Sequence, residues 1–398
     1  MGSMAKNIVF FSDGTGNDDA EDGDNTNVVM LCRRALDDGR RQVKEYDAGV
    51  GVGKRNFLGR PTGKGISGNI LDGYTFIARQ YEPGDYIFLF GFSRGAYTVR
   101  SLASFVELCG VVDRKGPVGG DVSEDTIDEA YSVYKIGDHD KRHKKAAEFR
   151  NRHAYAEHRD ESHQEKRAVH FIGVWDTVRS LGLPIDGKDV ELPFWEHRFH
   201  NHDLSPYVRY AYHALSVDDR RQAYHPTIWN EPTEAQNIGR PQSFEQVWFP
   251  GMHRDVGGGY KQRGLANITL RWMMKRALAA DPPLLLSPEF AADPYKGLTI
   301  DINEAPHDSR GSLWRKVLYR PEPRTVCKGT QQPGSTEITK TGEGEVSAYW
   351  LEHFQKRYPD PDYDSDSMHD HPDYKRAIEQ LKAGKPPEGP WRHIVPKD

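Results

Sequence analysis

The sequence is poor in cysteine and in long apolar runs. Its 398 residues include only Cys32, Cys109 and Cys327, which are odd in number and widely spaced, unlike a disulfide framework or a zinc site. Only 36% of the residues are hydrophobic, and no stretch approaches the roughly 18 apolar residues of a membrane helix. We expect a polar protein made in a reducing compartment, without metal or other cofactor.

An excess of positive charge is also absent. The chain has 54 Lys and Arg against 59 Asp and Glu, a net charge of -5, which disfavours nucleic acid as a partner and general attraction to anionic lipid surfaces. The N-terminus has no recognisable secretory signal, so we expect a cytoplasmic location. Export by a non-classical secretion system is the alternative.

Short apolar runs alternate with segments of helical periodicity. A run such as 86–90, with no polar alternation, is typical of a strand covered on both faces. Strands separated by helices predict an α/β domain built on a mostly parallel sheet with helices on both faces. The predicted strands are 8–11, 86–90, 169–175 and 245–249, and the predicted helices are 27–35, 69–81, 96–108, 207–216 and 265–279.

Two regions depart from this alternation. Residues 114–166 form a polar insertion whose later part is crowded with charged residues and histidine; it fits a solvated helical insertion, or a lid. From 281 proline becomes frequent and only short helices near 346–357 and 373–383 are predicted. We expect a catalytic domain over 4–280 and an irregular extension over 281–398 packed on it.

The strongest chemical motif is Gly-Phe-Ser-Arg-Gly, centred on Ser93. Glycines two residues before and after a serine permit the strained strand-to-helix turn that exposes its hydroxyl above the sheet. The motif follows the apolar run 86–90 and precedes the predicted helix 96–108. This context predicts a nucleophile elbow rather than a tight turn with an incidental serine.

An activated serine needs a histidine base and an acid, which in α/β-hydrolases follow in the order acid, then histidine. Asp176 comes directly after the strand 169–175, and His253 follows the strand 245–249. We predict them as the acid and the base. Asp218 is a rival acid, although its charged neighbours fit ion pairing better.

His253 is distinguished from the other histidines by the glycines around it. They allow a tight loop to hold the imidazole near Ser93, and Asp255 could either orient that loop or compete with Asp176 for the ring. The cluster of His197, His200 and His202 does not have the spacing of a zinc site.

An oxyanion hole requires two backbone N–H groups. We predict the N–H of Arg94 as one, and a second from the loop containing Gly14 and Thr15, which follows the first strand. Asp13 in the same loop fits a structural acceptor that fixes it.

Two other motifs match known sites incompletely. The glycine-rich segment 49–55 lacks both the first glycine and the Ser or Thr of a phosphate-binding loop. The acidic run 18–24 departs from the calcium-loop pattern at Ala20. A solvated loop is the simpler interpretation, with weak calcium binding left open.

Six segments together are specific to one family, and they occur in its order. With them, the sequence resembles the α/β-hydrolase family that includes the catalytic domains of type VI secretion lipase effectors. The resemblance implies a Ser-Asp-His triad at Ser93, Asp176 and His253, and hydrolysis of carboxylic esters, with phospholipids as substrates of the effector members. The segments are 11–17, 46–51, 84–97, 173–178, 212–218 and 248–260.

The predicted function is therefore that of a serine ester hydrolase of lipase or phospholipase type. Its partners would be an ester or lipid substrate, a membrane surface and, for an exported effector, an immunity protein. An esterase or thioesterase for a soluble substrate is the first alternative, and a non-catalytic binding scaffold with the same fold is the second.

Overall fold

A computed structural model of the chain describes most of the residues up to 307 and a few segments beyond. The predicted oxyanion residue Thr15, the acidic run 18–24, the histidines at 197–202 and Cys327 lie outside the described residues. The described residues are 5–14, 25–49, 65–115, 122–160, 162–178, 204–221, 224–230, 242–307, 324, 326, 328–331, 338–341, 345–347, 373, 376, 379–380 and 394–395.

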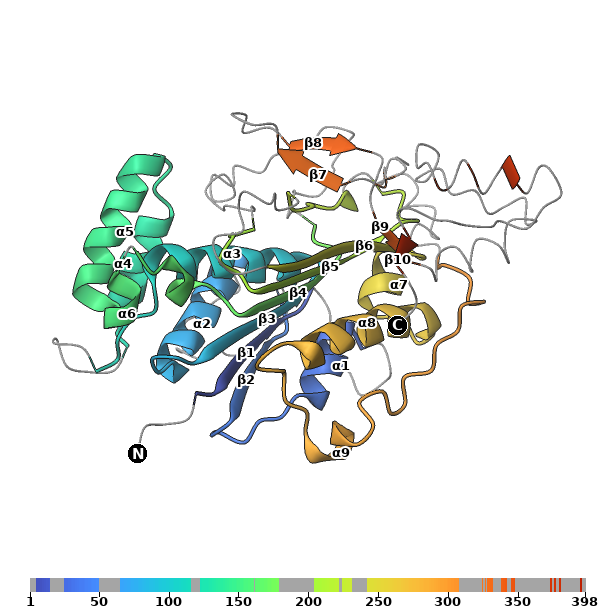
Figure 1. Ribbon diagram of the computed structural model, residues 1–398, viewed down its shortest axis with the longest axis horizontal. Coiled ribbons are helices and arrows are strands. Elements are labelled where there is room, and N and C mark those ends of the chain that lie inside the picture. Colours follow the sequence, from blue (N-terminus) through green and yellow to red (C-terminus); the bar gives the residue numbers. More distant parts are fainter. Residues whose placement is uncertain are drawn as a thin grey trace.

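The described part of the chain is organised around an eight-stranded sheet in which every pair of neighbours is parallel. The strand order is β10-β9-β6-β5-β4-β3-β1-β2 (Figure 1). The chain adds β2 on one side of β1 and then the later strands on the other side, so the order switches between β1 and β3. In such a sheet, ligands bind beyond the carboxyl ends of the strands. The strands are β1 (Asn7–Ser12), β2 (Gln42–Asp47), β3 (Tyr86–Phe92), β4 (Phe171–Trp175), β5 (Tyr210–Ser216), β6 (Ser243–Phe249), β9 (Glu345–Ser347) and β10 (Ile394–Val395).

Helices cover both faces of the sheet, as predicted (Figure 1). One apolar cluster packs α2 (Gly65–Gln80) and α3 (Arg94–Cys109) on the first face, and a second packs α1 (Asn27–Arg34) and α8 (Gly264–Ala279) on the other. None of the described helices is long and apolar enough to cross a membrane. The predicted α/β-hydrolase-like fold is confirmed. The remaining elements are α4 (Glu124–Tyr134), α5 (His139–His153), α6 (Ala156–Arg159), η1 (Gln164–Arg167), α7 (His253–Gly257), α9 (Pro288–Ala291) and the antiparallel pair β7 (Lys328–Gln331) and β8 (Ile338–Thr341).

One predicted helix is wrong. The segment 207–216 was expected to be helical, but Tyr210–Ser216 forms β5, a central strand between β4 and β6. A strand buried on both faces loses the alternation that would identify it, and its alanines and leucine also suit a helix. Tertiary pairing therefore decides the structure of this segment.

The C-terminal extension contributes to the sheet. A helix was predicted near 346–357, but its first residues, Val346 and Ser347, belong to the strand β9, which pairs with β6 through Val247 and Trp248. Val346 is fully buried. A strand of three residues is too short to show an alternating pattern of its own. Its pairing with β6 stabilises it, which explains why the sequence did not predict it.

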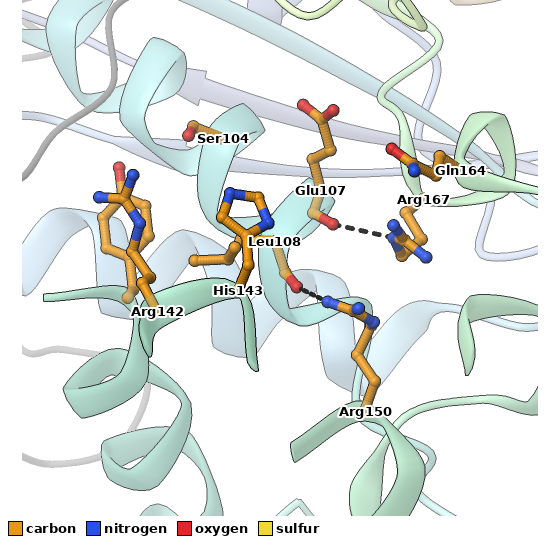
Figure 2. Close-up of a pocket in the computed structure, with 9 residues that line it drawn as sticks. Ser104, Glu107, Leu108, Arg142, His143, Arg150, Gln164 and Arg167 are labelled. Carbon is orange, nitrogen blue, oxygen red and sulfur yellow. Dashed lines mark hydrogen bonds between the residues drawn. The ribbon is translucent and has the colours of Figure 1, made fainter. Parts of the chain in front are cut away.

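Buried arginines attach the polar insertion to α3. The guanidinium of Arg150 in α5 donates to the carbonyl of Leu108, and Nε of Arg167 in η1 donates to the carbonyl of Glu107 at 3.0 Å (Figure 2). These carbonyls lie in the last turn of α3, where they lack partners within the helix and attract cations. A pocket of about 190 Å³ remains between α3, α5 and η1. The insertion is thus held by polar contacts as well as by its apolar residues.

The substitution Arg150→Met should lower the free energy of unfolding by about 1–3 kcal/mol, because the buried Leu108 carbonyl loses a charged donor. Denaturant unfolding measures the change. Lys144→Met, at an exposed position of the same helix, is the control and should change stability by less than about 0.5 kcal/mol. Equal midpoints for the two variants would contradict this role of Arg150.

Candidate active site

Ser93 lies in a strained turn between β3 and α3. Its backbone has φ 58° and ψ -121°, a conformation that a non-glycine residue adopts only when its surroundings impose it. A Cβ atom on Gly95 would lie 2.1 Å from the carbonyl oxygen of Ser12, and one on Gly91 would lie 2.5 Å from that of Gly95. Both glycines are therefore required by close backbone approach, which is the geometry of a nucleophile elbow.

The three residues selected from the sequence lie within hydrogen-bond distance of one another. His253, the first residue of α7, has its Nε2 atom 2.9 Å from Oγ of Ser93 and its Nδ1 atom 2.5 Å from Oδ2 of Asp176. All three are buried, with exposed fractions of 8% for Ser93, 4% for His253 and 0% for Asp176. In this arrangement the imidazole lies where it can accept the proton of the hydroxyl, and the carboxylate holds the other side of the ring.

The parallel sheet explains why distant residues meet here. Ser93 follows β3, Asp176 follows β4, and His253 comes a few residues after β6, so all three lie at the carboxyl edge of the sheet. The N–H of Ser93 donates to the carbonyl of Trp175 at 3.0 Å, and that of Asp176 donates to the carbonyl of Ala214 at 2.8 Å. These bonds fix the turns after the strands relative to one another.

Electrostatics favours a charged acid and a neutral base. Burial opposes the charge of Asp176, but the nearby Arg324 guanidinium and His253 outweigh it and hold the pKa of the carboxyl well below its ordinary value. For His253, burial outweighs the attraction of Asp176 and lowers the pKa of the imidazole. An uncharged imidazole is the form that can accept the Ser93 proton.

Arg324 is a residue of the site that the sequence analysis missed. It lies in the C-terminal extension, is only 2% exposed, and makes two hydrogen bonds to the Asp176 carboxylate. No motif surrounds it, and 148 residues separate it from Asp176.

Asp218, the alternative acid, makes no contact with the His253 imidazole in the part of the chain that the structure describes. Oδ2 of Asp218 instead accepts the N–H of Gly251 at 2.6 Å, and burial raises its pKa to about 7. Its neighbour Asp219 accepts the backbone N–H of His253 at 3.2 Å and pairs with Arg221. Both aspartates therefore fix the loop that carries His253.

Asp255 also contacts this loop. Its Oδ2 atom accepts the N–H of Met252 at 2.9 Å, and its Oδ1 atom lies 2.6 Å from Nδ1 of His307. These contacts raise the pKa of His307, mainly through the hydrogen bond to Asp255. Asp255 thus contacts the backbone of the loop and His307, which is consistent with orienting the loop rather than competing with Asp176 for the His253 ring.

The loop after β1 lies beside the elbow. The carbonyls of Ser12 and Asp13 are the atoms that a side chain on Gly95 would meet. Asp13 accepts the N–H of Gly14 at 2.6 Å and the hydroxyl of Tyr46 at 3.0 Å, and it also pairs with Thr26. The Gly14 N–H would have to turn from this carboxylate to reach an oxyanion, so its role remains a prediction, as does that of Arg94.

The substitution Gly95→Ala should displace the elbow or the β1 loop, because the new methyl group would overlap the Ser12 carbonyl. We expect at least about a 100-fold loss of Ser93 labelling by a fluorophosphonate, since small misplacements of reacting groups cost about this much. Ala103→Gly, at a partly buried position of the same helix, controls for the change in helix stability. Labelling of Gly95→Ala at the wild-type rate would contradict the close approach.

A family model and one sequence relative match parts of this chain. A family model for the catalytic domain of Tle1-like phospholipase effectors of type VI secretion matches residues 6–276. The Saccharomyces cerevisiae protein YEL023C, described as uncharacterised, is 27% identical over 236 residues, which cover 55% of this chain and 32% of the yeast protein. The chain therefore spans about a third of that relative's length.

Two solved structures are also similar. An uncharacterised protein from Pseudomonas aeruginosa is 16% identical with a TM-score of 0.46, and the match covers 97% of this chain and 60% of the other. The Tle1 effector bound to the VgrG spike of the type VI secretion system is 17% identical with a TM-score of 0.31, covering 65% of this chain and 51% of the other. The resemblance seen in the sequence is confirmed by the family match over 6–276, and the chain belongs to the family of Tle1-like phospholipase effector catalytic domains.

Proposed function

We propose that this protein is a serine hydrolase that cleaves the carboxylic esters of phospholipids. Ser93 is the nucleophile, His253 the general base and Asp176 the acid that orients the imidazole. The observation that supports this assignment most directly is the continuous set of contacts, 2.9 Å from Ser93 to His253 and 2.5 Å from His253 to Asp176, at a strained strand-to-helix turn.

The reaction proceeds by two acyl transfers. Nε2 of His253 takes the proton from Ser93 as its oxygen attacks the ester carbonyl, and the Asp176 carboxylate stabilises the imidazolium. The N–H of Arg94, with Gly14 or Thr15, binds the oxyanion. The imidazolium then protonates the departing alcohol. In the second transfer His253 takes a proton from water, the resulting hydroxide attacks the acyl-enzyme, and the imidazolium returns the proton to Ser93 as the carboxylic acid leaves. No cofactor is required.

Membership of the phospholipase effector family supports a lipid substrate over a soluble ester. A lipid substrate entails contact with a membrane surface, and an effector would be exported from the cytoplasm and neutralised in the producing cell by an immunity partner. A nucleic acid is not a partner under this proposal, given the net charge of -5.

The substitution Ser93→Ala should leave the fold intact and reduce phospholipid hydrolysis by about 10⁴-fold or more, because no other group replaces the nucleophile. Release of fatty acid from phospholipid vesicles and turnover of p-nitrophenyl esters measure this. Ser101→Ala is a matched control, since Ser101 is a fully buried serine in α3, the helix that follows Ser93.

Wild-type turnover by Ser93→Ala would refute the serine mechanism. Hydrolysis of p-nitrophenyl esters without release of fatty acid from vesicles, across acyl chain lengths and headgroups, would retain the mechanism and replace the phospholipid by a soluble ester or thioester. Absence of all turnover together with absence of fluorophosphonate labelling in the wild type would favour the binding scaffold.

The pH dependence of kcat/KM follows from the lowered pKa of His253. The free enzyme is active when this imidazole is neutral, so activity is retained above its pKa and lost as the pH falls through it. Because burial lowers this pKa, the acid limb should have its midpoint below about pH 6.5, the ordinary value for histidine. A midpoint above that value, measured with a substrate that does not ionise, would contradict the assignment.

A further inference from the structure

The Asp176 carboxylate is shared between two cationic or potentially cationic side chains. Nη1 of Arg324 lies 2.7 Å from Oδ1 of Asp176 and Nη2 lies 2.9 Å from Oδ2, the same oxygen that contacts His253. Arg324 and Asp176 are both buried. Such a bidentate pair fixes the plane of a carboxylate as well as its charge.

Further contacts hold Arg324 in place. Its Nη1 atom donates to the carbonyl of Ser216 at 2.8 Å and to the hydroxyl of the same residue, and its Nη2 atom donates to the carbonyl of Tyr224. Ser216 is the last residue of β5, and its N–H donates to Asp176 at 3.1 Å. The guanidinium therefore links the C-terminal extension to the carboxyl edge of the sheet.

The other charges that face His253 largely compensate each other. Asp219, which accepts the His253 N–H, is paired with Arg221 at 2.6 Å. Among the residues that the structure describes, the other groups shown against the ring are the aromatic rings of Phe92 and Tyr224, at ring-centroid distances of 4.6 and 5.0 Å, and the Ser93 hydroxyl. Among the described residues, Arg324 is thus the cation that directly balances the charge of Asp176.

We propose that Arg324, supplied by the C-terminal extension, is a positioning residue that fixes the Asp176 carboxylate and limits how strongly it stabilises the His253 imidazolium. This proposal rests on the serine mechanism proposed above. A carboxylate paired with a guanidinium attracts the imidazolium less than an unpaired one does, because the two nearby charges partly cancel. The base consequently remains neutral, and active, at lower pH.

The family match ends at 276, whereas Arg324 lies beyond the predicted boundary at 281. Under this proposal the catalytic unit includes described residues of the extension, among them Arg324 and the strand Glu345–Ser347 that pairs with β6.

The test compares Arg324→Met with Arg324→Lys through the pH dependence of kcat/KM. Arg324→Met removes the charge and both hydrogen bonds to Asp176, together with those to Ser216 and Tyr224. We expect a loss of kcat/KM of roughly 10- to 100-fold, as for other small misplacements of catalytic groups, and an acid limb displaced to higher pH. Arg324→Lys keeps the charge but loses the bidentate geometry, so its acid limb should stay near that of the wild type while kcat falls less.

The control is Arg150→Met, which removes a similarly buried arginine that donates to a backbone carbonyl away from the triad. It should lose stability but keep the wild-type acid limb. A wild-type acid limb and kcat in folded Arg324→Met would show that Arg324 only anchors the extension and would overturn the proposal. If Arg324→Met does not fold, a wild-type kcat in Arg324→Lys has the same meaning. Turnover by Ser93→Ala would instead refute the underlying serine mechanism.

Discussion

A carboxylate without any exposed surface is the constraint on which the site depends. Asp176 is 0% exposed, and a charge in such a place is stable only when it is paired and hydrogen-bonded. Its partners come from β5, from α7 and from the C-terminal extension. The requirement to satisfy one charge therefore joins the central strands, the loop that carries the base and the end of the chain.

The sequence predicted the parts of the fold whose signals are local. The apolar run before Ser93 and the helix after it identified the elbow, because the motif and its context lie within a few residues. Asp176 and His253 were selected because each follows a recognisable strand, and in the structure His253 contacts both Ser93 and Asp176. The sequence wrongly predicted a helix where β5 lies, because a strand buried on both faces shows no alternation of apolar and polar residues.

Arg324 could not be predicted, for a different reason. An arginine in a proline-rich polar segment resembles any surface arginine, and its role is defined only by a partner 148 residues away. The same holds for β9, whose three residues form a strand because β6 offers an unpaired edge. A contact between residues this far apart in the chain leaves no local pattern in the sequence.

The sequence separation of these contacts bears on how the protein is made. Synthesis proceeds from the N-terminus, and earlier parts of a chain can begin to fold while later parts are still absent. Ser93, Asp176 and His253 would all have left the ribosome before Arg324 was added. If Arg324 sets the acid as proposed, a nascent chain carries an incomplete site until the segment around Arg324 has been translated. If the protein cleaves membrane lipids as proposed, this order delays its full activity in the cell that makes it.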